Sequence, residues 1–399
     1  MKKILIVIHD MRIGGAQKSL LSFLQCLEAS GMCGEYDIHV LPLNPKGEFL
    51  TQIPAGVTVD LPDNTLRWLG QHMSRELLTK HFSLRGLIGE GMWVIRKLLK
   101  RFPKGLNLPQ RVWHSWRKII PLRREKYDAA IAYMDGTPAY YVMDKVQADK
   151  KVLWLHNDYE KVEYHPAFDS PYYAACDAVV TISTECRQSI CAHHPEIAEK
   201  VHVLPNITAA EAVLGKSLEG ESDGFSTYPG LKLLTVGRLH EQKGIDMAIG
   251  AAELLRAQGV DFKWLVVGEG SERKSLEALL EKSGLQDAFV LAGARKNPYP
   301  YMRGCDILVQ PSRYEGKSIV LDEAKILCKP IVATRYSTVY DALEHGKTGW
   351  IVDMTSAAVA EGILRLRQDE VLREELVSHL HQQMAGNEDE CKHYIDLMF

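Results

Sequence analysis

The stretch that decides the fold is residues 307–334, ILVQPSRYEGKSIVLDEAKILCKPIVAT, which holds a strand, a loop, a helix and a second strand in one run. Its first three residues are apolar and precede a polar loop, as in a parallel strand buried on both faces. Ser318 is the predicted N-cap of a helix whose apolar side chains recur at helical spacing. Two carboxylates, Glu315 in the loop and Glu323 in the helix, can therefore face the carboxyl edge of a parallel sheet, where open α/β folds bind ligands.

The two acids are eight residues apart, in the frame EGKSIVLDE. This frame resembles the donor-site signature of retaining glycosyltransferases with the two-domain GT-B fold, in glycosyltransferase family 4. The resemblance implies donor contacts at Gly316, Lys317 and Ser318, where the helix N-terminus offers free N–H groups to a phosphate. Many relatives have a bulky apolar residue where Lys317 stands. That cation could contact a phosphate or an acidic sugar, or point to solvent.

A second motif follows the predicted strand at residues 232–236. VGRLHEQKGID, residues 236–246, resembles the V-G-R-L-x-x-x-K-G segment of the same family. Arg238 and Lys243 lie five residues apart across a turn. A guanidinium and an ammonium group at this spacing can hold the two phosphates of a nucleotide-sugar diphosphate.

The first half of the chain carries two further matches. Residues 14–18, GGAQK, follow the first predicted strand and resemble the family's GGA-[EQ]-[KR] loop, with Gly15 letting the backbone approach a ligand. Residues 154–159, WLHNDY, are similar to the family's W-x-H-x-D segment, whose histidine lies near the reacting sugar. The resemblance therefore places His156 in the catalytic site.

Strands and helices alternate through both halves of the 399-residue chain, which is long for one core. The predicted fold class is α/β, with two doubly wound Rossmann-like domains facing a cleft, the GT-B architecture. An acceptor-binding domain is predicted over residues 1–207 and a nucleotide-sugar-binding domain over 208–379. A helix over about 380–399 is expected to pack back on the first domain. Residues 208–230 are polar and lack apolar periodicity, which predicts a linker.

The composition is that of an ordinary soluble globular protein, with 46% hydrophobic and 25% charged residues and a formal net charge of -3. The eight cysteines include no C-x-x-C pair, which favours free thiols in a reducing cytosol over disulfides or zinc. No run approaches the eighteen or so apolar residues needed to span a bilayer. Arg273 stands where a dinucleotide fingerprint needs its third glycine, so NAD binding is set aside. No nucleic-acid partner is expected.

Residues 63–124 form a basic insertion with fourteen Lys or Arg against three acids. Four tryptophans, Trp68, Trp93, Trp113 and Trp116, are interleaved with the cations. Basic and aromatic amphipathic segments suit an anionic membrane or an anionic acceptor, although a solvated helical insertion fits equally well. The cations singled out for the acceptor or membrane are Arg96, Lys97, Lys100 and Arg101. The expected location is the cytoplasm, and peripheral attachment to the inner face of the cell membrane is left open.

The resemblance implies transfer of a hexose from a nucleotide-diphosphate donor, with UDP expected, to a hydroxyl of a glycan or lipid-linked acceptor. The anomeric configuration would be retained, and the pathway would make a surface polysaccharide or glycolipid. Glu315 would bind the sugar hydroxyls and Glu323 the donor ribose. The sequence contains no D-x-D, and Arg238, Lys243 and a helix N-terminus could stabilise the leaving diphosphate instead of a metal ion. No metal or other cofactor is therefore expected.

Two alternatives to a transferase stay open. A nucleotide-sugar epimerase or hydrolase of the same fold would use similar phosphate contacts and would turn over the donor without any acceptor. A non-enzymatic carbohydrate-binding scaffold would bind the donor weakly and turn over nothing.

Overall fold

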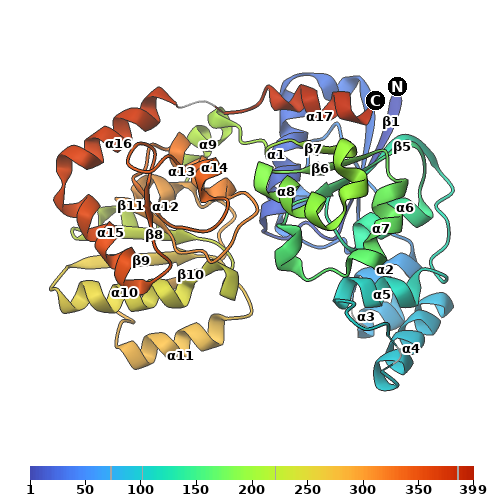
Figure 1. Cartoon of the computed structure of the whole chain (residues 1–399), viewed down its shortest axis with the longest axis horizontal. Coiled ribbons are helices and arrows are strands. Elements are labelled where there is room, and N and C mark those ends of the chain that lie inside the picture. Colours follow the sequence, from blue (N-terminus) through green and yellow to red (C-terminus); the bar gives the residue numbers. More distant parts are fainter. Residues whose placement is uncertain (72–73, 101, 221, 384–385) are drawn as a thin grey trace. The chain divides into compact units, whose positions relative to one another are not determined.

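The computed structural model of the chain describes residues 1–71, 74–100, 102–220, 222–383 and 386–399. The chain folds into two compact units: Met1–Ile207 with Asp389–Phe399, and Thr208–Glu388. Each unit is a parallel sheet with helices on both faces (Figure 1). This architecture confirms the predicted fold class of two Rossmann-like α/β domains. The chain returns to the first unit at Asp389 rather than at about residue 380, because the last helix of the second unit runs on to Gln382.

The first unit is built on seven parallel strands in the order β3-β2-β1-β4-β5-β6-β7. Leu5 and Val7 pack into the core on one face of the sheet, and Ile4 and Ile6 into the core on the other. This alternation is the one that a strand buried on both faces requires. The strands are β1 (Lys2–Ile8), β2 (Tyr36–Pro42), β3 (Thr58–Val59), β4 (Lys126–Ala132), β5 (Gln147–Leu155), β6 (Ala178–Thr181) and β7 (Val201–Val203). The helices are α1 (Gly15–Ala29), α2 (Asn64–Gly70), α3 (Arg75–Thr79), α4 (Leu84–Leu98), α5 (Leu108–Trp116), α6 (Thr137–Lys145), α7 (Pro166–Ala175), α8 (Thr184–His193) and α17 (Glu390–Met398).

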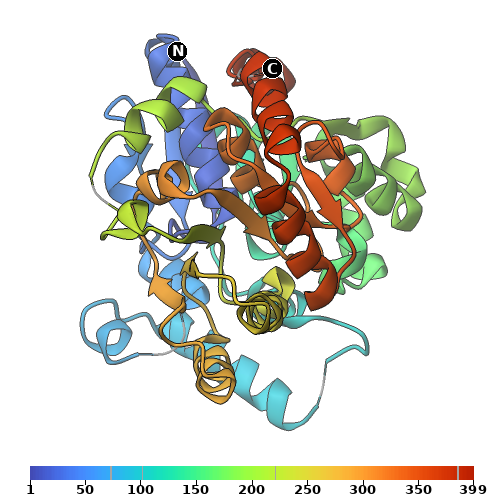
Figure 2. The same ribbon diagram turned by 90° about the vertical axis from the view of Figure 1, so that its left-hand side faces the viewer.

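The C-terminal helix α17 is an integral part of the first unit. The Tyr394 ring packs 4.3 Å from Trp154 of β5 and 4.9 Å from Phe23 of α1, measured between ring centroids. Its hydroxyl donates to the carbonyl of Pro205 at 2.7 Å. The two chain ends consequently lie close together (Figures 1 and 2), with the Lys2 ammonium 3.8 Å from the centre of the Phe399 ring.

The second unit has six parallel strands in the order β10-β9-β8-β11-β12-β13. Counted along the chain this is 3-2-1-4-5-6, the doubly wound order of dinucleotide-binding folds. The order reverses between the adjacent strands β8 and β11, and ligands of such folds bind at the carboxyl ends of the strands at that point. The strands are β8 (Leu231–Val236), β9 (Phe262–Val267), β10 (Phe289–Gly293), β11 (Ile307–Gln310), β12 (Ile331–Thr334) and β13 (Trp350–Val352).

The helices of this unit are α9 (Ala210–Ser217), α10 (Ile245–Ala257), α11 (Arg273–Ser283), α12 (Tyr299–Gly304), α13 (Ile319–Ile326), α14 (Val339–Ala342), α15 (Ser356–Gln368) and α16 (Glu370–Gln382). The predicted linker at 208–230 is wrong, because α9 lies inside it. Val213 of α9 is buried in the core of the second unit, and α9 packs on α12 and α13.

The basic insertion forms the helices α2 to α5, which gather at one edge of the first unit (Figure 1). Trp68, Trp113 and Trp116 are buried in the core there. The Trp113 indole donates to Asp144 Oδ2 at 3.0 Å, and the Trp68 indole to the carbonyl of His81 at 2.9 Å. Three of the four tryptophans are therefore core residues, which for these side chains favours the helical insertion over the membrane surface, the two alternatives that the sequence left open. Within the described ranges, no helix has the length and apolar character needed to cross a bilayer.

Candidate active site

The candidate donor site of the second unit lies where the strand order reverses. The loop after β8 runs against the loops after β9 and β11, and three glycines make this approach possible. A Cβ on Gly268 would lie 1.8 Å from the carbonyl oxygen of Gly237, and one on Gly270 would lie 2.2 Å from that of Leu239. Gly244 has a φ of +60°, and a Cβ there would meet the Pro311 carbonyl oxygen at 2.0 Å. Packing of loops, rather than a dinucleotide, explains the Gly-Glu-Gly after β9.

Lys243 and Glu315 meet at the centre of this site. The Lys243 ammonium lies 2.6 Å from Glu315 Oε1, although the two residues are 72 positions apart. Ser312 Oγ donates to the same oxygen at 2.6 Å and Gln310 Nε2 at 3.1 Å. The side chains of Lys243 and Glu315 are only 16% and 7% exposed, so the contact is a largely buried ion pair. Within the described residues, no donor reaches the other oxygen, Oε2, of Glu315.

A layer of hydrogen bonds fixes the loop that carries Glu315. Thr338 Oγ1 donates to the Glu315 carbonyl at 3.0 Å, and Thr334 Oγ1 donates to the Ser312 carbonyl at 2.5 Å. Ser318 occupies the N-cap position of α13, but its hydroxyl donates to Gln310 Oε1 at 2.8 Å instead of capping the helix. The predicted N-cap is thus right in position and wrong in hydrogen bonding. The amide of Gln310 consequently links the helix start to the carboxylate.

Glu323 is buried inside α13, with 3% of its surface exposed. The hydroxyl of Tyr299, on α12, donates to Glu323 Oε1 at 2.7 Å. Burial and the neighbouring carboxylate raise the pKa of Tyr299 well above its usual range, so the phenol keeps its proton. Tyr299 is a site residue that the sequence patterns missed, since nothing in a short helix start marks a partner 24 residues away.

The remaining predicted donor contacts surround this centre. Gly316 is buried beside Glu315, and Lys317 lies 3.7 Å from Asp322 of α13, with which it forms a loose ion pair. Arg238 is exposed at the end of β8, and its guanidinium reaches Gln242 Oε1 only at 3.5 Å. The structure therefore leaves the guanidinium of Arg238 accessible while it holds the Lys243 ammonium against a carboxylate.

His156 directly follows β5 in the first unit and is buried. Its ring lies 5.0 Å from the ring of Tyr133, and neither ring nitrogen has a hydrogen-bond partner of normal geometry among the described residues. Burial lowers the pKa of His156 to about 3, so the imidazole is neutral at physiological pH. A neutral ring can accept or donate one hydrogen bond without adding charge beside a reacting sugar.

Other polar groups lie at the same edge of the first sheet. Asp135 follows β4, and its carboxylate accepts from Asn157 Nδ2 at 3.3 and 3.4 Å. Burial raises the pKa of Asp135. Gly15 opens α1 after β1 and is exposed, with no atom within 4 Å of where a Cβ would stand. Asp135 is a site residue that the sequence patterns missed, although an acid soon after a buried strand is a signal for a sheet-edge site.

The cations predicted to contact an acceptor or membrane do not form one group. Arg96 is half-buried, and its guanidinium donates to the carbonyl of His114 at 2.9 Å, which ties α4 to α5. Lys97 and Lys100 are exposed. Arg101 lies outside the described residues. The Arg96 side chain thus holds two helices of the unit together, and its contact with an acceptor or membrane stays a prediction.

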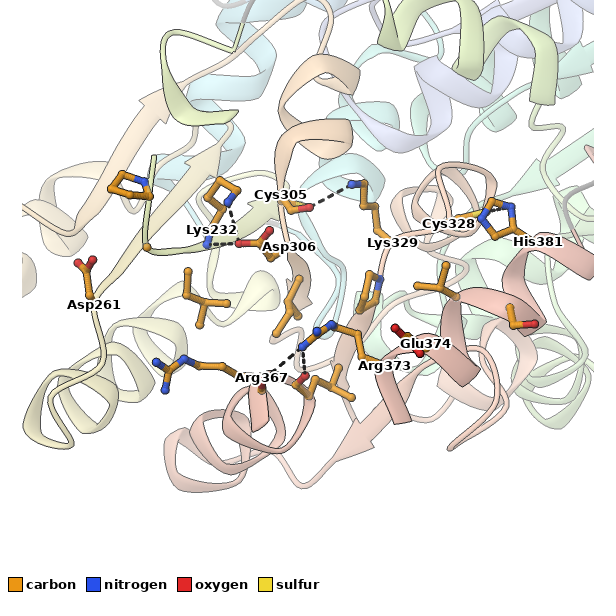
Figure 3. A pocket seen from close by; sticks show the side chains of 18 residues that line it. Lys232, Asp261, Cys305, Asp306, Cys328, Lys329, Arg367, Arg373, Glu374 and His381 are labelled. Atoms are coloured by element: carbon orange, nitrogen blue, oxygen red, sulfur yellow. Dashed lines mark hydrogen bonds and ion pairs between the residues drawn. The ribbon is translucent and has the colours of Figure 1, made fainter. Parts of the chain in front are cut away.

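A cavity of about 1000 Å³ lies at the opposite, amino-terminal end of the second sheet (Figure 3). Lys232 in its wall is paired with Asp306 at 3.0 Å, and the Arg373 guanidinium donates to backbone carbonyls of α15. Ligands of open α/β sheets bind at the carboxyl edge, so this cavity is separate from the candidate site. In the part of the chain that the structure describes, no group of three or more His, Cys, Asp or Glu side chains could hold a metal ion.

Comparison with known proteins identifies the family to which the second unit is similar. Residues 229–382, nearly the whole second unit, match the family model described as Glycosyl transferases group 1. The second unit of the chain is thus a group 1 glycosyltransferase domain. This glycosyltransferase is 27% identical over 282 residues to an alpha-D-kanosaminyltransferase of Streptomyces kanamyceticus, covering 65% of this chain and 72% of the relative.

A second relative matches almost throughout. It is the N-acetylgalactosamine-N,N'-diacetylbacillosaminyl-diphospho-undecaprenol 4-alpha-N-acetylgalactosaminyltransferase of Campylobacter jejuni, 23% identical and covering 94% of the glycosyltransferase and 92% of the relative. Among solved structures, Anabaena HepE in complex with UDP and glucose superposes with a TM-score of 0.71, 16% identity and 99% coverage of both chains. TarM of S. aureus, in a complex that includes UDP, gives a TM-score of 0.67 at 15% identity, with all of both chains covered. These structures establish the shared GT-B fold.

Proposed function

We propose that this glycosyltransferase moves a hexose from a UDP-sugar to a hydroxyl of a lipid-linked glycan, with retention at the anomeric carbon and without a divalent metal. The observation that carries the proposal is the cluster of Lys243, Glu315 and the start of α13 at the carboxyl end of β8 and β11. It combines a cation and helix N–H groups for a diphosphate with a carboxylate for sugar hydroxyls.

In this proposal the donor diphosphate replaces the Glu315 carboxylate as the partner of the Lys243 ammonium. The ammonium now pairs with Glu315 and would turn to the phosphate, joined by the exposed guanidinium of Arg238. Two cations and the N-terminal dipole of α13 then stabilise the negative charge that develops on the leaving group. Glu323, held by Tyr299, would accept hydrogen bonds from the ribose hydroxyls.

The reaction breaks the bond between the anomeric carbon and the diphosphate oxygen. The acceptor oxygen forms the new bond to that carbon on the same face, and its proton passes to the departing diphosphate oxygen. Glu315 Oε2 would hold sugar hydroxyls in the donor, and neutral His156 would donate to or accept from the reacting sugar. Because the leaving group itself takes the proton, no side chain has to act as a general base.

The relatives support the choice of donor and acceptor. HepE and TarM were solved with UDP, and the name of the Campylobacter relative specifies a diphospho-undecaprenol acceptor and an alpha product. Because this relative spans 94% of the chain, its acceptor is the best guide to the acceptor here. None of the eight cysteines, all of which lie in the described residues, forms a disulfide, which suits a reaction in a reducing compartment such as the cytoplasm.

The experiment that tests the proposal incubates the protein with a panel of nucleotide sugars, with and without lipid-linked glycans, in EDTA. We expect release of UDP that depends on the acceptor, and an α-linked product by NMR. Donor turnover that needs no acceptor would establish the epimerase or hydrolase alternative. Binding without turnover would establish a carbohydrate-binding scaffold, and a strict requirement for a divalent ion would contradict the metal-free reaction.

A further inference from the structure

Helix α4 of the basic insertion shows solvent a row of large aliphatic side chains. Leu84, Leu87, Ile88, Val94, Ile95 and Leu98, here called the α4 face, are 42–76% exposed. At 3.6 residues per turn they fall within an arc of about 120° along the whole helix. Phe82, just before the helix, and Leu99, just after it, are also more than half exposed. Scattered surface leucines are normal, but a continuous apolar row on a soluble protein marks a binding surface.

The opposite side of α4 is fixed to the unit. A Cβ on Gly86 would lie 2.5 Å from the ring of Trp68, and one on Gly89 would lie 2.6 Å from the ring of Trp116. The two glycines thus let the helix backbone pack directly on buried tryptophans. Arg96 adds its hydrogen bond to the carbonyl of His114 on α5. The α4 face is therefore turned outward by packing behind it, and it cannot be hidden without displacing the helix.

Positive charges border the α4 face. Arg85 and Lys97 are exposed on either flank of the helix and Lys100 just beyond its end, while the one acid of the helix is Glu90. A helix with an apolar face bordered by cations has the chemistry that lies in the headgroup region of an anionic bilayer. A two-fold pairing with a second copy would set these cations against their own counterparts. Charge thus favours lipid as the occupant over a second copy.

We infer that the α4 face binds an anionic lipid bilayer by inserting its aliphatic side chains between headgroups, with Arg85, Lys97 and Lys100 contacting lipid phosphates. This differs from adsorption by charge alone, because the aliphatic row contributes binding that salt does not screen. It deepens the proposed function by giving the enzyme a route to a lipid-linked acceptor. The inference can be tested without turnover, so that failure of transfer and failure of lipid binding are distinguishable.

The test is sedimentation of the whole protein with phosphatidylcholine vesicles that do or do not contain phosphatidylglycerol. We expect binding to the anionic vesicles, and Ile88→Ser combined with Leu98→Ser should weaken it about ten-fold or more. Leu218→Ser combined with Val371→Ser is the matched control. These two substitutions remove exposed apolar side chains from the second unit, so this variant should bind vesicles as the wild type does. Lys97→Gln with Lys100→Gln should weaken anionic binding roughly twenty-five-fold, about five-fold per cation.

Three outcomes overturn the inference. The wild type could stay in the supernatant with anionic vesicles at low salt. The serine pair could bind as well as wild type while high salt abolishes binding, which would leave charge as the whole interaction. Sedimentation equilibrium without lipid could show a dimer that the serine pair dissociates, which would assign the α4 face to a second copy. Retained unfolding midpoints in the serine pair confirm that its substitutions act on the surface.

Discussion

Replacing Lys243 by methionine removes one partner of the buried pair at the centre of the candidate site. Opposite charges 2.6 Å apart attract by about 6 kcal/mol at an effective dielectric constant of about 20. Desolvation of both groups offsets several kcal/mol of this attraction, but the variant also leaves the carboxylate of Glu315 buried with two neutral donors. We therefore expect Lys243→Met to lower the free energy of unfolding by about 2–4 kcal/mol. Each kcal/mol lost should lower Tm by about 2–4 °C.

Ligand binding separates a structural pair from a phosphate site. If Lys243 binds the diphosphate, Lys243→Met loses a charge-assisted contact and weakens UDP binding roughly 10- to 100-fold. Glu315→Gln has the opposite effect, because it releases the ammonium from its carboxylate: UDP should bind as tightly as to the wild type or up to about ten-fold tighter, while the rate of transfer falls.

Titration calorimetry with UDP, together with thermal unfolding, measures both effects. Lys347→Met is the matched control, since Lys347 pairs with Glu344 at an open surface where both side chains are 56% exposed. It should change the free energy of unfolding by less than about 1 kcal/mol and leave UDP binding unchanged. Wild-type UDP affinity in Lys243→Met, or equal weakening in Glu315→Gln and Lys243→Met, would refute the reasoning.

Three further predictions concern other parts of the two units. Arg238→Ala should remove about 2–4 kcal/mol of transition-state stabilisation, which kcat/KM measures. It should leave the unfolding midpoint of a melting curve unchanged, because the side chain is exposed. Glu323→Gln should weaken UDP binding through its loss of a charged acceptor, and Tyr299→Phe should weaken it less while costing about 1–3 kcal/mol of stability; unchanged calorimetry for both would rule out the ribose contact. His156 has a pKa lowered to about 3 in the folded state, so its protonation favours unfolding: the stability it gives is present above about pH 6.5 and is lost as the pH falls toward 3. Relative to His156→Gln, the wild type should therefore lose about 1.4 kcal/mol of its free energy of unfolding by pH 5.5. Denaturant unfolding of both proteins at several pH values measures this, and the same pH dependence in the two would contradict a neutral buried ring.

The sequence predicts the strands of both sheets well, because each is a short apolar run followed by polar residues. Helix α9 was not predicted because its eight residues include a glycine and three polar side chains and lie within a polar stretch, so its apolar positions form no visible period. It is helical because Val213 reaches the core, which is a tertiary cause. The role of the tryptophans in the insertion stayed open for the same reason, since a large ring beside cations has the same local pattern whether it faces lipid or the core.

The candidate site could be predicted in its members but not in its contacts. Motifs indicated Lys243 and Glu315 separately, with separate roles for phosphate and sugar. Their pairing depends on β8 and β11 being neighbours in the sheet, and no local pattern contains that information. The same is true of Tyr299, which reaches Glu323 from the helix before β11.

The position of α17 has a consequence for how the protein is made. Tyr394 and its neighbours cover Trp154 and Phe23 in the first unit, yet 181 residues of the second unit, Thr208–Glu388, are translated before α17. At the usual rate of protein synthesis this delay lasts roughly 10–40 s, during which the first unit has an uncovered aromatic surface. The second unit is one continuous segment and can close as soon as it leaves the ribosome. Although it begins the chain, the first unit is therefore the last to be completed. A nascent chain stalled in the second half would expose the aromatic surface that α17 covers, and chaperones can bind such a surface.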